Sequence, residues 1–114
     1  MRKQQIENAA YEVATQVRAV EDAIEAAIAE IADLQGKMVH ARGVTRVGFV
    51  TSHAAFEQLA NATVGLVSAR GGIASCHTAL VETKASVPGL RTVSYGDEGE
   101  CPPSEGMAAL RVVA

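Results

Sequence analysis

Residues 6–38, IENAAYEVATQVRAVEDAIEAAIAEIADLQGKM, decide the fold of this chain. Read at alternating intervals of three and four residues, they place ten apolar side chains on one stripe: Ile6, Ala10, Val13, Val17, Val20, Ile24, Ala27, Ile31, Leu34 and Met38. Such a 3.5-residue repeat keeps one narrow face of an α-helix against a partner helix over many turns. The sequence therefore predicts a helix over about residues 3–41 that needs a second helix, from this chain or from another copy.

The same rhythm returns after residues 43–51, GVTRVGFVT, whose glycines and β-branched residues predict a chain reversal compatible with a short strand. We expect a second helix over about residues 52–87, with a stripe of alternating large and small residues: Ala55, Leu59, Ala62, Leu66, Ala69, Ile73, Cys76 and Leu80. Closely spaced antiparallel helices interdigitate through such an alternation. Thr51 or Ser52 is the expected N-cap, and Pro88-Gly89 ends the helix.

Gly71 and Gly72 fall inside this second helix, where each costs about 1 kcal/mol relative to alanine. Two interpretations stay open. Paired small residues commonly mark a bend, which is the simpler interpretation. Alternatively, glycine lets another backbone approach closely.

The predicted fold is mainly α: a long, coiled-coil-like antiparallel hairpin over residues 1–88, followed by an extended tail over residues 89–114. The tail holds too little apolar surface to fold alone, so we expect it to pack on the hairpin or on a neighbouring subunit. Residues 91–95 read as a short strand. Leu110, Val112 and Val113 suit contact with a partner, for instance as a strand added to a sheet edge.

Composition excludes several classes of function. The formal charge of −3 and a pI near 5.5 argue against nucleic-acid binding, which needs a clustered excess of Lys and Arg. Polar residues from Glu7 onward interrupt any signal peptide, and no run of about 18 apolar residues exists to span a membrane. We therefore expect a cytoplasmic or virion protein without a membrane partner.

Residues that could carry chemistry are few. Cys76 and Cys101, with His40, His53 and His77, match no zinc-ligand spacing. We expect Cys76 to behave as a small apolar residue in the second stripe, and the three histidines to lie on polar faces. No catalytic or nucleotide-binding motif is present, and with two Phe, two Tyr and no Trp, a walled pocket is not favoured. The expectation is a non-enzyme with no catalytic residue, metal or cofactor.

Basic residues gather near the predicted reversal and give the candidate anion or partner contacts, which are Lys37, His40, Arg42, Arg46 and, further along, Arg70. Their simpler role is to complement the dipole at the end of the first helix. A small anion or a nucleotide held at subunit interfaces is the alternative.

Together these features predict a structural or accessory subunit of a larger assembly, such as a phage particle or a secretion apparatus. The expected partners are other copies of this chain and other protein subunits. Two alternatives remain from other classes. One is an oligomeric protein that binds or sequesters an anion or nucleotide, and the other is a helical regulatory adaptor that binds a partner helix through its apolar stripe.

A pair of neighbouring substitutions tests the first stripe. Ile24→Asp should abolish folding or association, because an unpaired carboxylate is costly to bury. Glu25→Gln should change the urea midpoint very little, because its side chain lies off the stripe. Equal effects of the two substitutions on circular dichroism and native mass would show that the assigned repeat is wrong.

Overall fold

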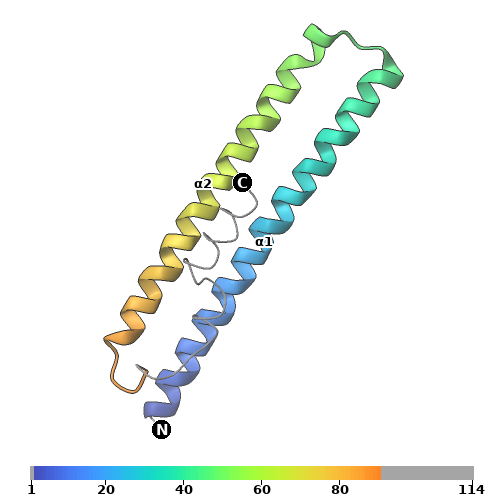
Figure 1. Ribbon diagram of the computed structural model, residues 1–114. Helices are drawn as coiled ribbons and strands as arrows, with labels where there is room; N and C mark the ends of the chain where they lie inside the picture. The colour runs from blue at the N-terminus through green and yellow to red at the C-terminus, as the bar shows by residue number, and fades with distance from the viewer. Residues whose placement is uncertain (1, 91–114) are drawn as a thin grey trace, which may run out of the picture. The chain divides into compact units, whose positions relative to one another are not determined.

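The computed structural model describes residues 2–90, which form two helices, α1 (Arg2–Thr45) and α2 (Phe49–Ala85) (Figure 1). Two compact units divide the chain, Thr15–His77 and the pair Met1–Ala14 with Thr78–Ala114. In Thr15–His77, α1 and α2 lie side by side and run in opposite directions. The predicted mainly helical hairpin is confirmed, while the predicted tail strands lie outside the described residues.

The first predicted stripe is shielded from water over most of its length. Eight of its ten residues are half-buried, whereas Val13 and Leu34 are exposed, so these two leave the contact. A helix with 3.6 residues per turn drifts by about 20° per heptad relative to a strict 3.5-residue repeat, so a long stripe keeps every position in the contact only if the helices supercoil around each other.

The second stripe keeps its predicted large residues but differs at the other positions, so the packing face of α2 is rotated relative to the prediction. We call this rotation a change of phase. Leu59, Leu66 and Ile73 are half-buried as expected of packing residues. The remaining positions of this repeat are Phe56 and Thr63, both half-buried, the exposed Arg70 and the buried His77. The other residues that the sequence placed in this stripe are exposed instead, and these are Ala55, Ala62, Ala69, Cys76 and Leu80.

Both phases share the same three large residues every seven positions, so the repeat alone cannot choose between them. In the structure the polar members of the contact find partners. The hydroxyl of Thr63 donates to the Leu59 carbonyl at 3.2 Å, and His77 meets a carboxylate of α1. Phe56 also offers far more apolar surface than an alanine, which favours its burial.

The reversal is shorter than predicted. α1 continues through Gly43 to Thr45, whose hydroxyl donates to the Ala41 carbonyl at 2.7 Å, and residues 46–48 alone connect the helices. Arg46 has φ 58°, the left-handed conformation that commonly ends a helix. α2 then starts at Phe49, earlier than the predicted N-cap, with the Gly48 carbonyl accepting from the Ser52 N–H at 3.1 Å.

The end of α2 follows the prediction made from proline. The last turn tightens into i→i−3 hydrogen bonds at Ser86 and Val87, which satisfy carbonyls that the helix leaves unpaired. Pro88 and Gly89, with φ 92° at the glycine, then form a turn closed by the Leu90 N–H donating to the Val87 carbonyl at 3.1 Å. These are the features of a type II β-turn.

Gly71 and Gly72 lie within an unbroken α2, and a Cβ built on either would meet no atom of the described residues within 4 Å beyond its chain neighbours and the backbone of its own helix turn. Close backbone packing inside the hairpin therefore does not explain them. Each glycine still makes the folded helix less stable than alanine would, because glycine gives the unfolded chain more backbone freedom to lose on folding.

Gly71→Ala should consequently raise the free energy of unfolding by about 0.5–1 kcal/mol, measured by urea denaturation at low protein concentration. A loss of stability instead would show that the backbone of another chain packs against this position.

Candidate interaction surfaces

Two charged or polar pairs join α1 to α2 within Thr15–His77. The outer pair is Arg70, whose Nε donates to Glu25 Oε1. Both side chains are more than half exposed, at 61% and 58%, so water and salt screen this ion pair. Exposed pairs of this kind contribute only about 0–1 kcal/mol to stability. Arg70 was a candidate anion or partner contact, and the structure pairs it with a carboxylate of α1 in its own chain.

The inner pair joins His77 to Glu21. His77 Nδ1 lies 3.0 Å from Glu21 Oε2, a distance that suits a hydrogen bond donated by Nδ1–H to the carboxylate. His77 is 8% exposed and is the single buried residue of the two described helices. The pair becomes ionic when the imidazole is protonated.

The structure corrects two expectations at adjacent residues. His77 was expected on a polar face and is buried, whereas Cys76 was expected in the packing stripe and is exposed. One residue corresponds to about 100° around a helix, so the change of phase in α2 moves one inward and the other outward. The signal that could have revealed His77 is its place on the repeat that starts at Phe56, together with Glu21 beside the α1 stripe.

The same change of phase leaves an uncharged surface on the outside of α2, which we call the neutral face. It consists of Thr51, Ala55, Gln58, Ala62, Gly65, Ala69, Gly72 and Cys76. All eight residues are exposed and follow one another at alternating intervals of four and three. Except for Gln58 they are small. A heptad-spaced face of small residues allows a second helix to approach closely.

Basic residues collect where α1 and α2 connect. Lys37, His40, Arg42 and Arg46 belong to the last turns of α1 and the connection that follows. The Arg42 guanidinium lies 5.5 Å from the centroid of the Phe49 ring, within the range of a cation–π interaction. Arg70 does not join this group, because it lies about 30 Å further along α2.

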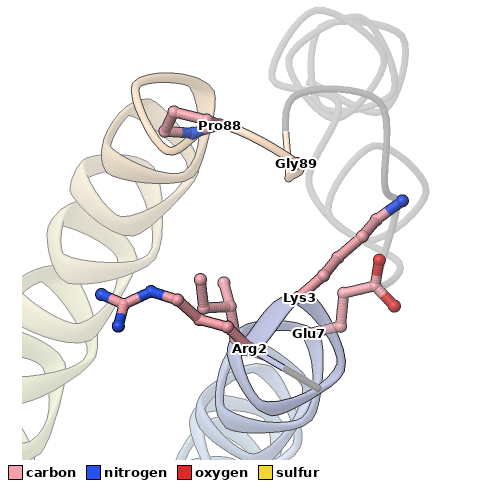
Figure 2. A pocket seen from close by; sticks show the side chains of 6 residues that line it. Arg2, Lys3, Glu7, Pro88 and Gly89 are labelled. Carbon is pink, nitrogen blue, oxygen red and sulfur yellow. The ribbon is translucent and has the colours of Figure 1, made fainter.

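A cavity of about 280 Å³ lies in the other unit, between the first turns of α1 and the turn after α2. It is lined by Arg2, Lys3, Ile6, Glu7, Pro88 and Gly89. Figure 2 shows Lys3 and Glu7 on one side of the opening and Arg2 extending to the other. Only Ile6 among these residues was a predicted site residue, as the first member of the α1 stripe.

Metal-ligating residues do not gather in the described part of the chain, where no three His, Cys, Asp or Glu side chains are grouped so that they could hold a metal ion. Among residues 2–90, neither helix combines the length and apolar character needed to cross a membrane. Cys101 and the predicted tail contacts Leu110, Val112 and Val113 lie outside the described residues.

No protein family, curated protein or solved structure matches this chain. Its surfaces are therefore interpreted from their geometry and chemistry.

The two interhelix pairs differ in burial, and their energies should differ accordingly. Glu21→Ala should lower the free energy of unfolding by about 1–3 kcal/mol, because it removes an acceptor from a buried imidazole. Glu25→Ala is the matched control and should cost about 0–1 kcal/mol. Urea titrations at neutral pH check both values. A Glu21→Ala midpoint equal to that of the control would contradict the assigned role of the inner pair.

Proposed function

We propose that this protein is a non-enzymatic structural or accessory subunit that assembles with other chains through α2. The observation that supports the proposal is the neutral face, a heptad-spaced helical surface that the hairpin itself leaves uncovered. A phage particle and a secretion apparatus are the kinds of assembly in which small helical subunits of this type pack side by side.

The distribution of charge favours α2 over α1 as the assembling helix. The exposed side of α1 within the same unit carries Asp22, Glu25, Glu30 and Asp33. Packing two such surfaces together would bring like charges into contact and remove carboxylates from water. The neutral face has no charge to desolvate, so association there is opposed mainly by the loss of motional freedom and by the desolvation of a few polar groups.

Partial burial along the hairpin supports the same conclusion. Leu59, Leu66 and Ile73 are only half-buried by α1, so some of their apolar surface remains available to a further helix. The small residues of the neutral face flank these three residues on α2. A helix laid on the neutral face could therefore extend the apolar contact that already joins α1 and α2.

Because we expect the chain to self-associate, we propose that α2 of a second copy covers the neutral face. A regulatory adaptor would use the same face for a helix of another protein, and native mass separates the two. The homo-oligomer predicts a mass that is a multiple of one chain, whereas the adaptor predicts a free chain that remains monomeric.

Charge introduced on the neutral face should break the association. Ala62→Glu and Ala69→Glu each place a carboxylate in the proposed contact, which should weaken association at least about tenfold. Analytical ultracentrifugation measures the native mass, and circular dichroism verifies that the helices remain.

Ser68→Glu is the matched control, because residue 68 is exposed on α2 but lies off the neutral face. It should leave the native mass unchanged. A monomeric unsubstituted protein would exclude self-assembly, and equal masses for all three variants would exclude the neutral face as the contact.

A further inference from the structure

The connecting end of the hairpin exposes large apolar side chains. We define the tip as residues 34–56, which includes the end of α1, the connection and the start of α2. Val50 and Phe49 are 86% and 72% exposed, and are the two most exposed large apolar residues of the described chain. Val44 is 68% exposed. The tip thus presents apolar surface that neither helix covers.

The charge of the tip is opposite to that of the rest of its unit. Lys37, Arg42 and Arg46 lie in it, and no acidic residue occurs between Asp33 and Glu57. The remainder of Thr15–His77 carries two basic and six acidic residues. An anionic surface would therefore attract the tip and repel the helices behind it, which favours an end-on approach.

Cation and aromatic ring are adjacent at the tip. Arg42 lies over the Phe49 ring, and Arg46 adopts the left-handed conformation that turns the chain. An arginine side chain combines an apolar stem with a charged head, and a phenylalanine ring beside it is wholly apolar, so the pair suits the boundary between lipid headgroups and acyl chains. The tip offers both components within a few residues.

We propose that the tip binds end-on to the surface of a bilayer that contains anionic lipids. The headgroups would pair with Lys37, Arg42 and Arg46, while Phe49 and Val50 would enter the apolar boundary below them. A bilayer can accept a projecting apolar end without a cavity that matches its shape. A protein partner would need an acidic groove whose shape fits the tip.

This inference goes beyond the proposed structural function and does not depend on self-association. The sequence-based expectation of no membrane partner rested on the lack of a spanning segment. Surface binding needs no such segment, since a few basic and apolar side chains suffice for reversible attachment.

The test is co-sedimentation of the full chain with vesicles of phosphatidylcholine alone, and with vesicles that also contain about 30% phosphatidylserine to give a negative surface potential. Binding is expected only to the anionic vesicles. It should be lost in about 1 M salt, where the Debye length is about 3 Å. No binding to anionic vesicles at low salt, or equal binding to both compositions, would overturn the proposal.

Substitutions assign the binding to the tip. Lys37→Gln and Arg46→Gln should each lower partitioning about fivefold, since each basic residue near an anionic surface contributes about 1 kcal/mol. Lys3→Gln, an exposed basic residue outside the tip, is the matched control. If Lys3→Gln lowered vesicle binding as much as the tip variants do, the assignment of binding to the tip would be refuted.

Val50→Ser tests the apolar part and should weaken binding severalfold, with little effect on folding because the side chain is almost fully exposed. Val64→Ser, at a 68% exposed position of α2 outside the tip, should leave binding unchanged. If Val50→Ser lowered the native mass of a protein assembly and left vesicle binding intact, the tip would be a protein contact and the lipid proposal would fail.

Discussion

The contact between two narrow apolar stripes is the constraint on which this structure depends. The large apolar residues of both stripes, such as Leu59, Leu66 and Ile73 of α2, are only half-buried. Each turn of helix therefore contributes little apolar burial, and stability must accumulate along the length of the contact. In the described residues only Leu90 and His77 are buried, so the hairpin has no centre that excludes water on every side.

A repeating apolar contact leaves the register of the two helices weakly determined. A slip of seven residues would present the same kinds of side chain to each other, while it would separate His77 from Glu21 and Arg70 from Glu25. Polar residues within such a contact commonly fix its register, because the wrong alignment buries them without partners. The inner pair contributes most to this selection, since His77 is buried and the Arg70 pair is largely solvated.

The two helices and their connection carry three chemically different outer surfaces. α1 is acidic on its exposed side, α2 is uncharged over the neutral face, and the tip is basic and apolar. Acidic surface keeps the hairpin hydrated and discourages unspecific contact, whereas the other two surfaces are suited to association. The neutral face and the tip meet at the start of α2, so the two proposed contacts would use mostly different residues of one small chain.

Apolar periodicity and helix-breaking residues act locally, so they were enough to predict the two helices, the reversal between them and most of the α1 stripe. The sequence could not determine the phase of the α2 stripe, since Leu59, Leu66 and Ile73 fit both alternatives. Tertiary pairing decided that phase. Glu21, distant in sequence, offers a partner to His77, and Cys76 consequently turns outward. The tertiary structure also set the helix ends at the reversal, where Gly43 costs only about 1 kcal/mol in a helix and α1 runs on to Thr45.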